Sequence, residues 1–133
     1  MRLLVAGVEP ALSLAIETAL REAGHLVDEE YSIDRVLKTL RRQAYDAVIV
    51  YGRSRYLNAV ELVRVIRGSE GGEVLPAVLV LVPVVNRVDR HGFGAVGADH
   101  VIALEGHSLL RTLIDGIEEA RKVRLAAVNA PHQ

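Results

Sequence analysis

Two arginines that follow a buried apolar run are the residues of this chain best suited to binding chemistry. Arg53 and Arg55 come directly after residues 46–51, a nearly uncharged run that ends in Tyr51. In an open parallel α/β sheet, ligands bind at the C-terminal ends of the strands. A guanidinium group binds phosphate or carboxylate through paired hydrogen bonds. One hypothesis is therefore a sensor of a small anionic ligand, a nucleotide or metabolite. The alternative is a solvated loop in which one arginine pairs weakly with Glu9.

No other set of residues has the spacing of a catalytic or metal site. The chain has no cysteine and neither of the glycine-rich phosphate-binding motifs. Asp89, His91 and Gly94 have the spacing of a cobalamin-binding motif, but they follow the fourth apolar run, whereas that motif follows the first strand. Ser54 lacks the strand–turn–helix elbow of a serine nucleophile. The sequence therefore predicts no enzyme activity, no cofactor and no metal site.

Length and charge narrow the class of protein further. A chain of 133 residues is long enough for one core and short for two, and we expect a domain over residues 1–125 followed by a tail over 126–133. The formal charge of -1 gives no reason to expect direct binding of nucleic acid or of an anionic membrane. The longest apolar run is far shorter than a membrane span. We expect a soluble cytoplasmic domain.

Five apolar runs alternate with five amphipathic segments. Strands are predicted over residues 2–6, 26–30, 46–51, 78–82 and 99–103, and helices over about 10–23, 32–43, 57–67, 86–96 and 109–128. The alternation predicts an α/β fold, a doubly wound five-stranded parallel sheet of order 2-1-3-4-5 with helices on both faces (flavodoxin-like). In the first helix, the predicted inward stripe is Leu12, Ala15, Ile16, Ala19, Leu20 and Ala23. Gly92 and Gly94 make the fourth helix the weakest one.

Six short segments at the right spacing resemble one family, the receiver domains of two-component response regulators. The resemblance covers about residues 1–125 and rests on segments 1–5, 9–12, 20–24, 45–50, 60–67 and 97–99. It implies the receiver fold. In that family, an acidic pair after the first strand and an aspartate ending the third hold Mg²⁺, and that aspartate accepts a phosphoryl group. A Thr or Ser ending the fourth strand and a Lys ending the fifth then bind the phosphoryl group.

None of these five positions carries the family's residue in this chain. The acidic pair falls on Gly7 and Val8, the phosphoacceptor on Tyr51, the hydroxyl on Val82 and the lysine on Leu104. The resemblance thus implies a degenerate receiver, or pseudo-receiver, whose phosphorylation site is lost. We predict that the Tyr51 ring fills the vacated space, packing with Val8 and Val82. The alternatives are that Tyr51 locks one signalling conformation or is itself modified.

The remaining expectation concerns a surface. The resemblance implies dimerisation or partner docking through the fourth helix, fifth strand and fifth helix, so we predict a protein-interaction module in bacterial signal transduction or transcription control. It would bind a second copy as a homodimer, or a sensor kinase or regulator. The competing interpretation is that the valines and Phe93 only cover the sheet. The candidate face comprises Val84, Val85, Val88, Phe93, His100, Arg111, Asp115 and Glu118.

Overall fold

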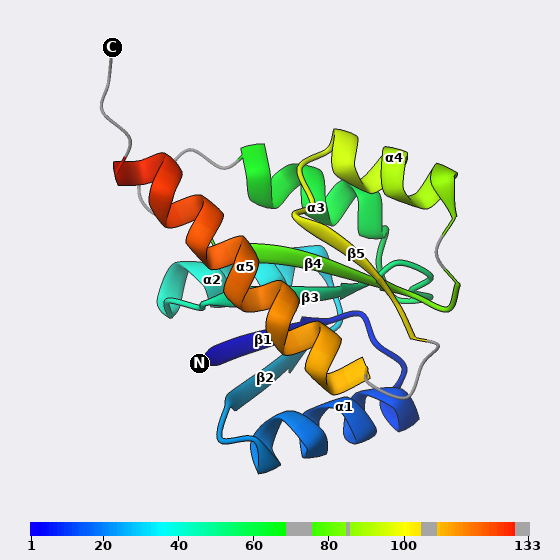
Figure 1. The fold of residues 1–133 in the computed structure, drawn as a ribbon. Coiled ribbons are helices and arrows are strands. Elements are labelled where there is room, and N and C mark those ends of the chain that lie inside the picture. The colour runs from blue at the N-terminus through cyan, green and yellow to red at the C-terminus, as the bar shows by residue number, and fades with distance from the viewer. Residues whose placement is uncertain (69–75, 85, 105–108, 130–133) are drawn as a thin grey trace.

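A five-stranded parallel sheet organises the structure, a computed structural model that describes residues 1–68, 76–84, 86–104 and 109–129, with residues 109–110 and 123–129 described by their backbone alone. The strand order is β2-β1-β3-β4-β5, which confirms the predicted topology (Figure 1). The elements in chain order are β1 (Arg2–Ala6), α1 (Pro10–Glu22), β2 (Leu26–Glu30), α2 (Ile33–Arg42), β3 (Ala47–Tyr51), α3 (Ala59–Gly68), β4 (Ala77–Val82), α4 (Arg87–Ala95), β5 (His100–Ala103) and α5 (Leu109–Asn129).

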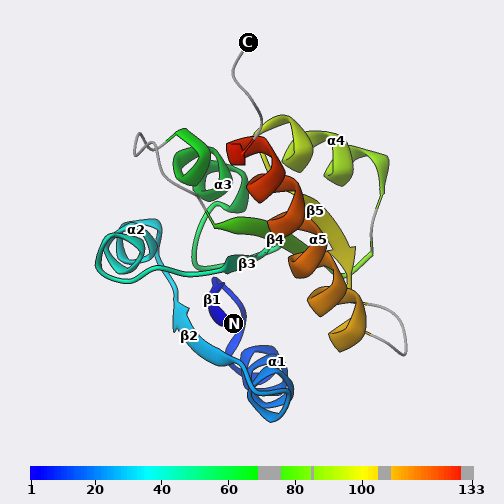
Figure 2. The same ribbon diagram turned by 60° about the vertical axis from the view of Figure 1, so that its left-hand side comes forward.

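Helices cover both faces of the sheet and divide the core into two layers. α1 and α5 pack on one face, and α2, α3 and α4 pack on the other (Figures 1 and 2). All six residues of β4 are buried, because a central parallel strand has helices on both sides. β2, by contrast, is an edge strand and carries Asp28, Glu29 and Glu30. Acidic residues at an edge oppose pairing with another sheet.

The buried side of α1 differs from the predicted stripe. Ile16 and Leu20 are buried as expected, but Ala15 and Ala23 are exposed, whereas Ser13 and Glu17 are buried. The reason is that alanines gain little from burial, while the polar pair finds partners on β2. The Ser13 hydroxyl lies 2.5 Å from a carboxylate oxygen of Glu29. Burial, followed by the proximity of Glu29, raises the pKa of the Glu17 carboxyl above its ordinary value.

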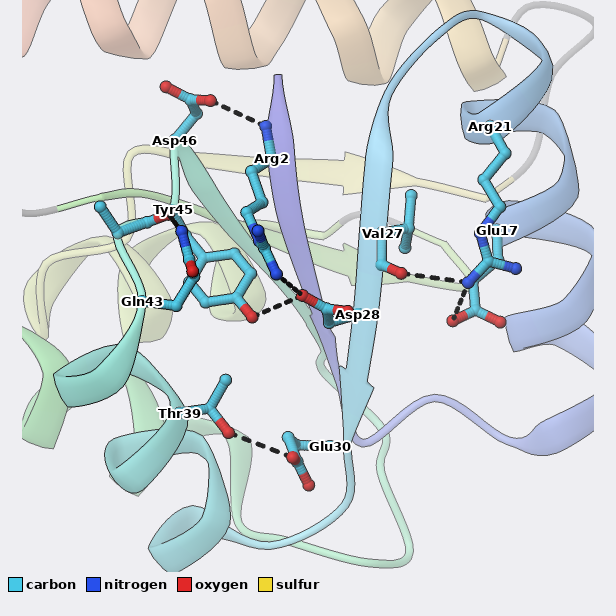
Figure 3. A network of polar contacts seen from close by, with 11 residues as sticks. Arg2, Glu17, Arg21, Val27, Asp28, Glu30, Thr39, Gln43, Tyr45 and Asp46 are labelled. Carbon is cyan, nitrogen blue, oxygen red and sulfur yellow. Dashed lines mark hydrogen bonds and ion pairs between the residues drawn. The ribbon is translucent and has the colours of Figure 1, made fainter.

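A network of polar contacts joins the strands at the N-terminal edge of the sheet (Figure 3). Asp28 accepts hydrogen bonds from the Arg2 guanidinium at 3.2 Å and from the Tyr45 hydroxyl at 2.6 Å. Burial and the bond to Asp28 raise the pKa of Tyr45 to about 12. Asp46 accepts from the backbone N–H of Arg2 and pairs with Arg121 of α5 at 3.2 Å. These contacts hold β1, β2 and β3 together near their N-terminal ends and attach α5 to the same part of the sheet.

The predicted division into a domain over residues 1–125 and a tail over residues 126–133 stays a prediction. α5 continues to Asn129, past the predicted domain end at residue 125, and residues 130–133 of the predicted tail lie outside the described part of the chain. None of the described helices is both long and apolar enough to cross a membrane.

Candidate functional site

The five positions named by the resemblance all reach the C-terminal edge of the sheet. Gly7 and Val8 follow β1, Tyr51 ends β3, Val82 ends β4 and Leu104 follows β5. Tyr51 and Leu104 are half-buried against the core under α1 and α5, which includes Val8. Val82 is fully buried in the other layer, so the predicted packing of Tyr51 with Val82 is wrong. The reason is strand alternation: Tyr51 is in register with Leu81, and the next residue of β4 faces the opposite side.

Gly7 is covered so closely by the chain that a side chain there would force its neighbours to move. Its φ is +71°, a left-handed conformation that favours glycine. A Cβ atom on Gly7 would lie 2.6 Å from Oγ of Ser54 and 2.9 Å from Cγ of Leu57. Both neighbours belong to the β3–α3 loop (residues 52–58), which therefore lies over the end of β1. An acidic side chain at this position would have to displace the side chains of Ser54 and Leu57.

Contacts with three other parts of the chain hold the β3–α3 loop. Arg55 pairs with Glu9, the residue before α1, at 3.3 Å. The Tyr56 ring packs edge-on against Tyr31, which follows β2, with centroids 5.0 Å apart. Within the loop, Ser54 Oγ accepts hydrogen bonds from the backbone N–H groups of Tyr56 and Leu57. The loop is thus fixed to the ends of β1 and β2 by packing and by an exposed ion pair.

The third anchor is Arg53, which joins the loop to α4. Its Nη2 atom lies 2.7 Å and 2.8 Å from the two carboxylate oxygens of Asp89, whose side chain is only 7% exposed. The backbone N–H of Asp89 donates to Oδ1 of Asn86, which caps α4. This cap and the ion pair compensate for Gly92 and Gly94, and α4 is a continuous helix. Sequence reasoning missed this role of Asp89, although an Asn three residues before an acid is a capping signal.

The pairing of both arginines bears on the anionic-ligand hypothesis. Arg53 already has a buried counter-charge in Asp89, and Arg55, 82% exposed, has Glu9. Free anions would have to compete with these carboxylates, so a small-anion sensor is not favoured. Arg55 pairs with Glu9, as the solvated-loop alternative predicts, while Arg53 has a different partner.

The residues at this edge do not fit the family's metal and phosphoryl group. Mg²⁺ requires several hard oxygen ligands, whereas Val8 and Leu104 offer hydrocarbon and Glu9 is engaged with Arg55. In the part of the chain that the structure describes, no three His, Asp or Glu side chains are grouped to hold a metal ion.

One concave surface near this edge lies between the β3–α3 loop, α3 and α4. It is a groove of about 350 Å³. Leu57, Val60, Val88 and Phe93 supply its apolar lining, and the Arg53 side chain stands at its side. It is displaced from the family's site toward the helices on the α2–α3–α4 face.

The predicted interaction face is partly as expected. Val84 and Val88 are 55% and 79% exposed, which is unusual for valine. Phe93 must be removed from the face, because it is 4% exposed and packs in the core against β4, as the competing interpretation holds. Val85 lies outside the described residues. The remaining members have charged or titratable side chains. His100 is half-exposed, and Arg111, Asp115 and Glu118 are exposed.

Comparison with solved structures shows which known proteins share this fold. The chain is similar to the chemotaxis response regulator CheY4 of Vibrio cholerae, with 18% identity and a TM-score of 0.75 over 86% of this chain and 97% of that chain. It is also similar to the receiver domain of the sensor histidine kinase PA1611 from Pseudomonas aeruginosa, with 24% identity and a TM-score of 0.73 over 88% and 97% of the two chains. A third is the non-phosphorylated HemR receiver domain of Leptospira biflexa, with 20% identity and a TM-score of 0.72 over 99% and 98%.

These similarities show the receiver fold of response regulators. No protein-family model matches the sequence, and no curated protein matches it either. The PA1611 structure has a magnesium ion coordinated in its active-site cleft. In the present chain, the C-terminal edge of the sheet carries Gly7, Val8, Tyr51, Val82 and Leu104.

Proposed function

We propose that this chain is a phosphorylation-independent receiver-fold domain that works as a protein-interaction module in bacterial signal transduction or transcription control. It is not an enzyme in this proposal, and its signal is a change of contacts with another protein. The observation that carries the proposal is the covered Gly7, whose Cβ space is taken by Ser54 and Leu57. An acidic side chain of the kind that holds the family's metal could stand here only if Ser54 and Leu57 moved, which supports the proposal.

The surroundings of Gly7 support the same proposal. Val8 is 1% exposed, and Tyr51 and Leu104 pack against its core layer. Burying a phosphoryl group and a metal ion among such side chains is costly, because charged groups in apolar surroundings lose their hydration. The β3–α3 loop is also held by Arg53 and Arg55, which link it to α4 and to the start of α1. The chain's own side chains thus contribute to holding the loop.

The partner surface in this proposal is the α4–β5–α5 face, and its first partner is a second copy of the chain. Val84 and Val88 are exposed apolar side chains before and on α4, and α5 carries exposed charges of both signs. An apolar centre with a polar rim is the usual anatomy of a protein interface. A sensor kinase or regulator is the other partner class for this face.

Intact-mass spectrometry after incubation with acetyl phosphate and Mg²⁺ tests phosphorylation independence. We expect no phosphoryl adduct, and we expect Tyr51→Asp to remain unmodified as well, because the acidic pair and the lysine are still missing. A stable adduct on the unaltered protein would refute the proposal.

Sedimentation velocity tests the dimer. Val84→Glu/Val88→Glu should weaken self-association at least about tenfold, because two like charges would face their copies across the interface. Leu14→Glu/Leu26→Glu is the matched control, since Leu14 on α1 and Leu26 on β2 are 64% and 63% exposed. An equal effect of both variants, or a wild-type monomer at all concentrations, would contradict the homodimer.

A further inference from the structure

α2 carries a concentration of exposed positive charge. Its ten residues include four basic ones and one acid, a formal charge of +3, whereas the whole chain has -1. The other 123 residues therefore carry -4. Arg35, Lys38, Arg41 and Arg42 are all exposed and, with Asp34, fall within an arc of about 120° of the helix at 3.6 residues per turn. We call these four cations the α2 basic face.

Most arginines elsewhere in the described chain have a carboxylate partner, but those of α2 do not. Arg2, Arg53 and Arg67, for example, are bound to Asp28, Asp89 and Asp99. On α2, the one ion pair is between Lys38 and Asp34 at 3.4 Å, with both side chains more than 60% exposed. Among the described residues, the guanidinium groups at positions 35, 41 and 42 have no side-chain partner.

From these observations we propose that the α2 basic face docks an acidic helix of a partner protein. The spacing of Arg35, Lys38 and Arg42 is three and then four residues, which aligns them along one line of the helix. Carboxylates spaced three or four residues apart on a partner helix match that line. The proposal rests on the function proposed above, because it names a partner surface for the same interaction module.

The surroundings of α2 favour a short acidic segment over an extended polyanion. A helix of ten residues is about 15 Å long. It lies beside the edge strand β2 (Figure 2), which carries Asp28, Glu29 and Glu30. A nucleic-acid duplex or a membrane surface would extend past α2 and meet this acidic strand. An acidic helix of matching length avoids that repulsion.

Fluorescence anisotropy with a labelled peptide tests the docking. The probe is a fourteen-residue alanine-based helix with glutamates three and four residues apart, compared with a peptide of the same composition whose glutamates are dispersed around the helix. We expect the aligned peptide to bind more tightly at 50 mM salt and to lose affinity at 300 mM, because exposed charge pairs are screened. Arg35→Gln/Lys38→Gln/Arg42→Gln should weaken its binding about tenfold, as three exposed ion pairs allow.

The matched control removes the same charge without touching α2. Arg64→Gln, Arg87→Gln and Lys122→Gln combined remove three exposed cations from α3, α4 and α5 and should change affinity less than twofold. Equal loss in both triple variants, or equal binding of the two peptides, would overturn the proposal. So would tighter binding to duplex DNA or phosphatidylserine vesicles, or salt-sensitive self-association that the α2 variant abolishes. None of these readouts involves acetyl phosphate, so they fail or succeed independently of the phosphorylation test.

Discussion

Replacing Gly7 by alanine tests whether the β3–α3 loop fills the place of the family's acidic pair. A non-glycine residue in the left-handed region costs about 1–2 kcal/mol. The new Cβ would also lie 2.6 Å from Ser54 Oγ, and moving Ser54 disturbs its two backbone hydrogen bonds. Overpacking of this kind costs about 1–3 kcal/mol. We therefore expect Gly7→Ala to lower the free energy of unfolding by about 2–5 kcal/mol, measured by urea denaturation with far-ultraviolet circular dichroism.

Gly24→Ala provides the matched control for the backbone contribution. Gly24 has a φ of +90°, also left-handed, but nothing lies within 4 Å of its Cβ position. Its cost should be backbone strain alone, about 1–2 kcal/mol. The reduced flexibility of the unfolded chain is common to both variants and cancels in their difference. Because Leu57 also lies against Gly7, Gly7→Ala should cost about 1 kcal/mol less in a Leu57→Ala background. Equal losses for Gly7→Ala and Gly24→Ala would refute the packing of the loop over this site.

Three further predictions concern stability, each measured as the free energy of unfolding. Glu17 has a raised pKa, so its contribution is complete below the unfolded pKa and is lost as the pH rises through the folded pKa. Relative to Glu17→Gln, the wild type should lose stability with rising pH in that window, and parallel pH profiles would contradict this. Arg53→Ala should cost about 1–3 kcal/mol because it leaves a buried carboxylate without its cation. Asp89→Asn in the same background should restore part of the loss, and no restoration would argue against the pair. Phe93→Ala should cost about 3–5 kcal/mol and Val88→Ala less than about 0.5 kcal/mol, whereas similar costs would place both on the surface.

The fold could be predicted from sequence because its signals are repetitive. Apolar runs such as residues 78–82 and the amphipathic segments between them specify strands and helices independently of any single residue. Parallel connections and right-handed crossovers then leave few possible strand orders. Helix limits were also close: the fourth helix was predicted over 86–96 and is Arg87–Ala95 in the structure.

The details of the site could not be predicted, because they depend on which side chains meet across the chain. Periodicity alone assigned Ala15 to the core of α1, whereas Glu17 is buried there beside Glu29 and Arg21. Arg53 was predicted to be solvated or to pair with Glu9, but its partner Asp89 is 36 residues away in sequence. Such long-range polar contacts leave no periodic signal.

The most direct measurement is an amide NMR titration of the ¹⁵N-labelled protein with Mg²⁺ and then beryllofluoride, a phosphoryl mimic. Closure of the site by the β3–α3 loop predicts no saturable shift at Gly7, Glu9 or Tyr51 beyond the general effect of ionic strength. A saturable shift at these amides that requires both Mg²⁺ and beryllofluoride would show that the domain retains a receiver's metal and phosphoryl site.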